Sequence, residues 1–178
     1  MGALTIAPGD LPVALDEVKA MLRIASGDED ALIAGLARSA ADLCERFTGR
    51  LLIARAVNET LARRTGWQRL GAAPVQAIDT VAALDAAGEA TPLGIGDYSI
   101  DIDALGEGWV RLHAAPAGAR VRVRYVAGMA ASPSDLPEAL RQGIVRLAAH
   151  FFIERDAAAG PPAAVTALWR PWRRLSIA

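Results

Sequence analysis

Residues 28–52 read DEDALIAGLARSAADLCERFTGRLL, and this stretch predicts one long amphipathic helix around which the rest of the chain is arranged. Its apolar residues recur at steps of three and four, so a period of 3.6 residues places them on one stripe. The stripe consists of Ile33, Leu36, Ala37, Ala40, Leu43, Cys44 and Phe47. A capping box of Ser26 and Glu29 predicts the start of the helix, and Gly49 predicts its end. Because such a stripe is stable only when it is buried, the chain must supply an apolar partner surface.

Two further segments show helical spacing and are expected to pack against the helix at 30–48. Residues 15–23 predict a short first helix, and the link to the long helix is too short to let the two separate. Residues 135–155 predict a third helix, opened by a capping box of Asp135 and Glu138. The sequence therefore predicts a three-helix bundle.

Between residues 53 and 127 the apolar pattern changes from helical spacing to alternation. Two segments alternate clearly and predict half-buried strands with one apolar face. Their apolar residues are Tyr98, Ile100 and Ile102 in the first and Val121, Val123 and Tyr125 in the second. Weaker strands are expected near 54–63, 77–84 and 108–113, separated by glycine-containing turns. The expected fold is α+β, with an antiparallel β meander inserted into the helical bundle and an extended or short-helical C-terminal tail.

Composition limits the classes of protein to which the chain can belong. A length of 178 residues with 53% apolar residues suits one globular domain. The single cysteine, Cys44, lies on the apolar stripe, so we expect a buried thiol and no disulfide. No segment approaches the ~20 apolar residues of a membrane span, and no signal-peptide pattern opens the chain. We therefore expect a cytosolic protein or a member of a soluble assembly.

No catalytic, cofactor-binding or metal-binding set is expected. His150 and Glu154 lie four residues apart on a helix, but zinc needs three or four ligands and no other His or Cys joins them. His113 is isolated on a strand, and Ser39 has no histidine at a plausible distance. The sequence thus favours a role without catalysis.

Arg120, Arg122 and Arg124 alternate on one predicted strand and form a candidate DNA-facing row, since three guanidinium groups on one face can contact phosphates. The competing interpretation is cross-strand pairing with Asp101 and Asp103, which alternate in the same way. The sequence favours the pairing.

The segment LWRPWRR at residues 168–174 holds two of the four tryptophans among arginines. Trp and Arg are enriched where a protein buries a partner. Alternatively, Trp169 and Trp172 fold back and cover the chain's own core. Because prolines interrupt this segment and the link before it, we expect the tail to be mobile in the free protein.

The order of these elements resembles that of the head-tail connector (adaptor) proteins of tailed bacteriophages and gene transfer agents. The resemblance rests on LDEVKAMLRI, an acidic link, DALIAGLARSAADLCERFTGRLL, a β insertion ending VRVRYVAGM, LPEALRQGIVRLAAHFFIERD and the closing LWRPWRR. It covers most of the chain and implies a structural, non-enzymatic role.

The resemblance also implies partners. Copies of the protein would form a ring, commonly of twelve, between the portal protein and the stopper or tail-terminator proteins, with duplex DNA passing through the channel. The ring would lie in the neck of a phage or phage-like particle assembled in the bacterial cytoplasm, and no cofactor is implied. Residues 1–163 would form the connector domain and residues 164–178 a tail that reaches the portal. The implied portal-binding residues are Leu168, Trp169, Arg170, Pro171, Trp172, Arg173 and Arg174.

Two rival functions remain open from the sequence. A small DNA-binding accessory protein would use the arginine strand and the basic tail, although a net charge of −1 lacks the basic field that such proteins usually show. An enzyme of unrecognised type would show saturable turnover.

Overall fold

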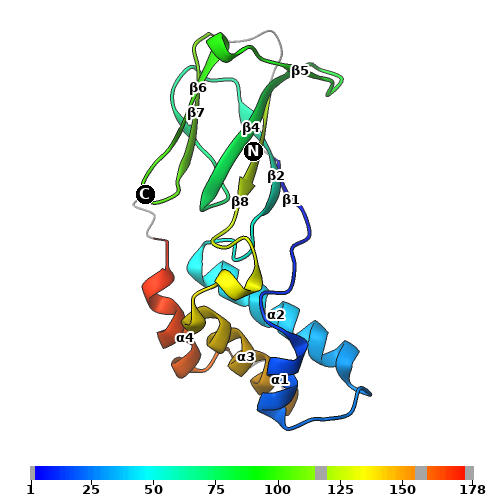
Figure 1. The fold of residues 1–178 in the computed structure, drawn as a ribbon. Coiled ribbons are helices and arrows are strands. Elements are labelled where there is room, and N and C mark those ends of the chain that lie inside the picture. Colours follow the sequence, from blue (N-terminus) through cyan, green and yellow to red (C-terminus); the bar gives the residue numbers. More distant parts are fainter. Residues whose placement is uncertain (1–2, 115–119, 155–159, 175–178) are drawn as a thin grey trace. The chain divides into compact units, whose positions relative to one another are not determined.

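The structure is a computed structural model that describes residues 3–114, 120–154 and 160–174 (Figure 1). The chain forms two compact units, each with its own core. The β unit comprises residues 1–9 and 54–129, and the helical unit comprises residues 10–53 and 130–178. The described part of the C-terminal tail packs within the helical unit.

The helical unit contains four α-helices and two 3-10 turns within the described residues. These elements are α1 (Leu15–Leu22), α2 (Asp30–Thr48), η2 (Pro133–Asp135), α3 (Glu138–Ile153), α4 (Ala163–Trp169) and η3 (Arg170–Trp172). Three of the helices match the predicted ones to within three residues at each end. The fourth, α4, packs against α3 and α2, so the description as a three-helix bundle is incomplete.

Helix α2 buries the middle of its predicted stripe. Ile33, Ala37, Ala40 and Cys44 have no exposed surface, and α3 is the main partner of this face. Leu36, Leu43 and Phe47 are only half-buried. Across the unit, the Arg141 guanidinium of α3 pairs with the Glu17 carboxylate of α1. The apolar stripe therefore supplies the core that the sequence requires, but its edge remains accessible.

The predicted helix starts are corrected by the structure, whereas the predicted helix end is confirmed. Helix α2 begins at Asp30, and its N-cap residue Glu29 makes no side-chain cap, so Ser26 lies too far upstream to form the box. Before α3, the carboxylate of Asp135 accepts hydrogen bonds from Ser132 N–H and Ser132 Oγ, and caps η2 instead of pairing with Glu138. Gly49 ends α2 with a φ of 68°, in the left-handed region that favours glycine.

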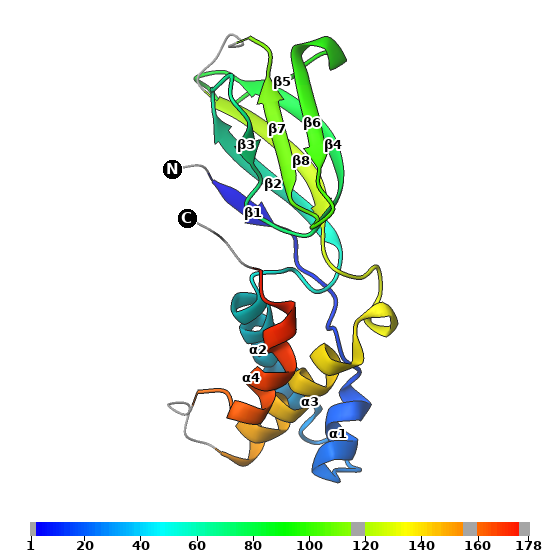
Figure 2. The ribbon, with the colours of Figure 1, turned by 90° about the vertical axis from the view of Figure 1, so that its left-hand side faces the viewer.

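The β unit holds eight strands within the described residues. They are β1 (Leu4–Ile6), β2 (Arg55–Ala62), β3 (Gln68–Arg69), β4 (Val75–Leu84), β5 (Ala90–Pro92), β6 (Tyr98–Ile102), β7 (Gly108–Leu112) and β8 (Arg120–Ala127), with the 3-10 turn η1 (Ile95–Asp97) before β6. A five-stranded sheet has the order β1-β2-β8-β4-β5, and a three-stranded sheet has the order β3-β7-β6. Figures 1 and 2 show the smaller sheet stacked on one face of the larger.

The strand order is not the predicted meander, although all named strand pairs are antiparallel. Strand β8 pairs with both β2 and β4, so the last strand of the unit occupies the middle of the larger sheet. Its apolar face is buried as predicted: Val121, Val123 and Tyr125 are at most 1% exposed. The Tyr125 hydroxyl donates to Glu59 Oε2 at 2.8 Å and accepts from Ala72 N–H at 3.1 Å. Strand β8 thus anchors the core of the β unit.

Strand β6 lies at an edge of the smaller sheet and departs from its predicted burial. Ile100 and Ile102 are 45% and 37% exposed, so this strand is less buried than its alternation predicts. Strands β1, β3 and β5 were not predicted, and each has only two or three residues.

In the part of the chain that the structure describes, no helix is both long and apolar enough to cross a membrane.

Candidate partner-binding surfaces

The C-terminal segment is held in the helical unit by Trp169. This side chain has no exposed surface, and its ring lies 5.9 Å from the ring of Phe47. Its indole N–H donates to the carbonyl of Leu140 on α3 at 3.4 Å. Trp169 is therefore a core residue of this unit, and the fold-back interpretation is correct for it.

Gly143 makes the room that Trp169 occupies. A Cβ at this position would lie 2.8 Å from Cε2 and 2.9 Å from Cδ1 of the indole, and closer still to Nε1. Carbon atoms do not approach so closely, so any larger residue at 143 would displace the ring. The helical spacing of α3 shows that Gly143 faces inward, but it does not identify the side chain that packs there.

The end of the described tail is tied to the C-terminal end of α2. Arg174 N–H donates to Thr48 O at 2.6 Å, and Arg50 Nε donates to Trp172 O at 3.2 Å. The Arg173 guanidinium lies 5.4 Å from the centroid of the Phe47 ring, within the range of a cation–π contact. Residues 163–169 form a short helix, in line with the short-helical form expected for the tail, and residues 175–178 lie outside the described residues.

The remaining tail residues differ in how much surface they present. Arg170, Pro171 and Arg173 are exposed, whereas Leu168, Trp172 and Arg174 are half-buried. Of the seven candidate portal-binding residues, only Trp169 is fully enclosed. A partner could therefore contact the segment without unpacking it from α3.

The arginine row lies on the outer face of the larger sheet. Since Val121, Val123 and Tyr125 point into the core, Arg120, Arg122 and Arg124 point the opposite way. Asn58 and Thr60 of β2 lie opposite Arg124 and Arg122 in the register.

The expected pairing of this row with Asp101 and Asp103 is wrong. Asp101 lies opposite Trp109 in the β6–β7 ladder, and Asp103 Oδ1 accepts hydrogen bonds from the N–H groups of Leu105 and Glu107. The two segments belong to different sheets, because β2 and β4 occupy both edges of β8.

Comparison with known proteins found similar chains among solved structures. No family model and no curated protein matches the chain. Among solved structures, a chain from the neck of a native GTA particle computed with C12 symmetry is 30% identical, with a TM-score of 0.76, covering 99% of this chain and 97% of that one. The chain belongs to the head-tail connector (adaptor) family.

Two more solved structures are similar to this connector along almost its whole length. A chain from the neck of an empty GTA particle computed with C6 symmetry is 28% identical, with a TM-score of 0.83 and coverage of 99% and 97%. A chain from the virion of a native gene transfer agent (GTA) particle is 29% identical, with a TM-score of 0.75 and coverage of 98% and 97%. The connector is thus a structural protein of the neck of a phage-like particle.

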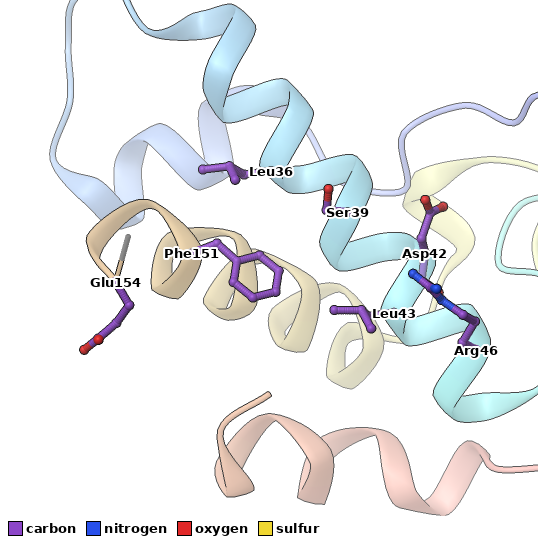
Figure 3. Close-up of a pocket in the computed structure, with 7 residues that line it drawn as sticks. All are labelled: Leu36, Ser39, Asp42, Leu43, Arg46, Phe151 and Glu154. Atoms are coloured by element: carbon purple, nitrogen blue, oxygen red, sulfur yellow. The ribbon is translucent and has the colours of Figure 1, made fainter. Parts of the chain in front are cut away.

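A cleft on the helical unit of the connector lies between α2 and α3 (Figure 3). It is lined by Leu36, Ser39, Asp42, Leu43, Arg46, Phe151 and Glu154. Phe151 is directed toward the side of α2 that carries Leu36 and Leu43, whereas Glu154 points away from it. The half-buried edge of the α2 stripe is the apolar wall of this cleft.

Two polar side chains of this cleft are engaged with helix backbone. Ser39 Oγ donates to Gly35 O at 3.1 Å, and Arg46 Nε donates to Asp42 O at 3.3 Å. The cleft also presents the apolar side chains of Leu36, Leu43 and Phe151, which suit a packing surface.

His113 is not isolated, contrary to the expectation from the sequence. One ring nitrogen, Nε2, lies 2.7 Å from Ser99 Oγ, and the other, Nδ1, lies 2.7 Å from Gly96 O. These bonds tie η1 to the end of β7. Among the described residues, no group of three or more His, Cys, Asp or Glu side chains is placed to hold a metal ion.

Cys44 is buried against the core, as predicted. Burial, and to a lesser degree the charge of Glu45, raises the pKa of the Cys44 thiol far above its usual value. The thiolate is the reactive form of cysteine, so this residue is a packing group.

Proposed function

We propose that this protein forms a ring in the neck of a phage-like particle, between the portal protein and the stopper or tail-terminator proteins. The observation that carries the proposal is the 30% identity over 99% of the chain to a neck chain in a structure with C12 symmetry. A second similar neck structure was computed with C6 symmetry. Both symmetries are cyclic and compatible with a closed ring of twelve copies.

A ring of identical chains needs heterologous contacts, in which each copy presents two different surfaces. The cleft between α2 and α3 offers one apolar surface on the helical unit. Exposed apolar side chains on the same unit include Met21 at 46% and Leu32 at 54%. Contacts of this kind hold copies together without any catalytic group.

We propose that the tail contacts the portal protein through its accessible residues Arg170, Pro171, Trp172 and Arg173, with Leu168 and Arg174 at the margin. Arginine and tryptophan suit this task because they contribute most to protein interfaces. Trp169 acts indirectly by fixing α4 on α3, since it has no exposed surface. Substitution of Arg170 and Trp172 together by alanine would then preserve folding while reducing attachment to the portal.

Particle assembly tests this function. A producing strain that lacks the gene should accumulate DNA-filled heads without tails, and the wild-type gene should restore complete particles. Electron microscopy of complete particles should show this chain as a ring in the neck. Particles with normal necks from the deletion strain, or a single copy of the chain per neck, would contradict the proposal.

The second candidate function is that of a small DNA-binding accessory protein, and it is favoured by the outward arginine row of β8. It predicts that the protein is free of the particle and binds duplex DNA tightly as a monomer. Purified particles decide between the two, because an accessory protein would be absent from their necks.

A further inference from the structure

We propose that the outer face of the five-stranded sheet carries a binding cleft for the phosphate groups of duplex DNA. The cleft is lined by Ala3, Thr5, Asn58, Thr60, Arg122 and Arg124. This inference rests on the passage of duplex DNA through the neck ring, which the family resemblance implies, and it names the surface that meets the DNA backbone.

Three neighbouring strands bring these residues together. The register places Thr5 of β1 opposite Asn58 of β2, and Asn58 opposite Arg124 of β8. Thr60 lies opposite Arg122, and its backbone N–H donates to Ala3 O at 2.8 Å, which fixes β1 at the edge of the cleft. The cleft thus rests on regular backbone pairing.

The charge of the cleft is uncompensated within the described part of the chain. No hydrogen bond or ion pair there engages the side chain of Arg122 or Arg124, and no acidic side chain lines the cleft. The acid nearest in sequence, Glu59, lies between Asn58 and Thr60 but is directed to the opposite face, where its carboxylate accepts from Tyr125 Oη and Gly71 N–H. Two like charges side by side disfavour the free protein and favour the binding of an anion.

This charge is local to the cleft. The β unit contains eight arginines and eight aspartate or glutamate residues, so its formal charge is zero. A net basic field is therefore absent, and attraction of a polyanion depends on the two arginines that line this cleft. The net charge of −1 for the whole chain consequently does not exclude a phosphate site.

The remaining groups suit a phosphate backbone better than bases or an apolar partner. The hydroxyls of Thr5 and Thr60 and the amide of Asn58 can donate to phosphate oxygens, as such side chains do in protein–DNA complexes. No aromatic ring lines the cleft, so bases have no stacking surface. Arginines two positions apart in a strand are ~6.8 Å apart along it, so the two guanidinium groups can contact different phosphates.

A single copy would bind weakly. Two phosphate contacts give a slope of about −1.8 for the logarithm of affinity against that of salt, so a rise from 50 to 200 mM salt should weaken binding roughly 12-fold. A ring would repeat the contact in every copy and raise the total avidity. Weak, salt-sensitive binding by the free protein is therefore the expected result.

Nuclear magnetic resonance of the free full-length protein tests the site. Amide spectra should be recorded during titration with a 12-base-pair duplex, with inorganic phosphate and with polyglutamate, each at 50 and 200 mM salt. With the duplex, the largest shifts should fall on Thr5, Asn58, Thr60, Arg122 and Arg124. Inorganic phosphate should give smaller shifts at the same residues.

Two double variants complete the experiment. Arg122→Gln with Arg124→Gln should remove the duplex response, whereas Arg64→Gln with Arg111→Gln removes two exposed arginines of the same unit outside the cleft and should retain it. No duplex response, a response centred elsewhere, or equal loss in both variants would overturn the proposal. An equal response to polyglutamate would also overturn it, in favour of an acidic protein partner. Since the test uses free protein, its failure leaves the ring proposal intact, and failure of the ring leaves this test unaffected.

Discussion

Two arginine-bearing segments of the connector, the tail at residues 163–174 and strand β8, are held in place in different ways. Trp169 is the largest side chain that holds the tail, and it occupies a space that exists because residue 143 is glycine; buried Val165 and the hydrogen bonds of Arg174 N–H and Trp172 O add to this contact. Strand β8 is anchored along its length by ladders on both sides and by three buried side chains. The comparison teaches that the tail depends strongly on one buried ring, whereas the anchoring of β8 is distributed along the strand and does not involve its outer face.

The largest effect is expected when the buried Trp169 ring is removed. Trp169→Ala should lower the free energy of unfolding by ~3–5 kcal/mol, because a fully buried aromatic ring leaves a cavity. Trp172→Ala, three residues later and half-buried, should cost less than about 1 kcal/mol. Denaturant unfolding followed by circular dichroism compares the two variants. Equal losses would mean that Trp169 is not the main anchor of the tail.

Gly143→Ala tests the same anchor from the opposite side. The added methyl overlaps the indole ring, so the free energy of unfolding should fall by ~1–3 kcal/mol, even though alanine is the better helix former. In the Trp169→Ala background the same substitution should cost nothing or stabilise the protein, since the space is then empty. A double-mutant cycle measures this coupling. Additive losses would show that Gly143 does not make the room for Trp169.

On β8, the contribution of the buried Tyr125 side chain can be tested by removing its hydroxyl group. Tyr125→Phe leaves Glu59 and the N–H of Ala72 without the phenol group, which should cost about 1–2 kcal/mol. Tyr98→Phe is a matched control, because the described chain shows no hydrogen bond for that hydroxyl and the side chain is only half-buried. Thermal unfolding of both variants gives the comparison. A similar loss in both would indicate that the Tyr125 hydroxyl contributes little.

The smallest effect concerns the outer face of β8. A double-mutant cycle of Asp101→Asn and Arg122→Gln should give a coupling energy near zero, below about 0.3 kcal/mol, because the two residues lie in different sheets. Each single substitution should change the free energy of unfolding by no more than about 0.5 kcal/mol. A favourable coupling near 1 kcal/mol would restore the cross-strand pairing that the structure contradicts.

Features that depend on near neighbours in the chain were predictable. The helical periods around Ile33 and Leu140 and the alternation around Val123 gave element positions close to those observed, since both periods follow from backbone geometry. The capping boxes were less predictable. Ser26 and Asp135 both fit the pattern, but Glu29 occupies the N-cap of α2 without a side-chain cap, and Asp135 pairs with Ser132 at η2.

The candidate sites were predictable as residues but not as surfaces. The alternation of Arg120, Arg122 and Arg124 showed that they share one face, and nothing in it revealed that Thr5 and Asn58 would join them. The spacing of Trp169 and Trp172 suggested a pair with one role, whereas one is enclosed and the other half-exposed. An alternating pattern predicts which residues of a strand share a face, but it does not predict which strand will lie beside it.

The sequence by itself determined three of the four described helices, five of the eight described strands, the inward face of α2 and of β8, and the resemblance to connector proteins, because these follow from local periodicity and from the order of elements along the chain. Only the tertiary structure decided that β8 lies between β2 and β4, that Asp101 and Arg122 belong to different sheets, and that Trp169 packs over Gly143. Each of these depends on pairing between residues distant in the chain. The physical reason is that such pairing is selected by the shape and burial of the whole unit, which no single segment contains.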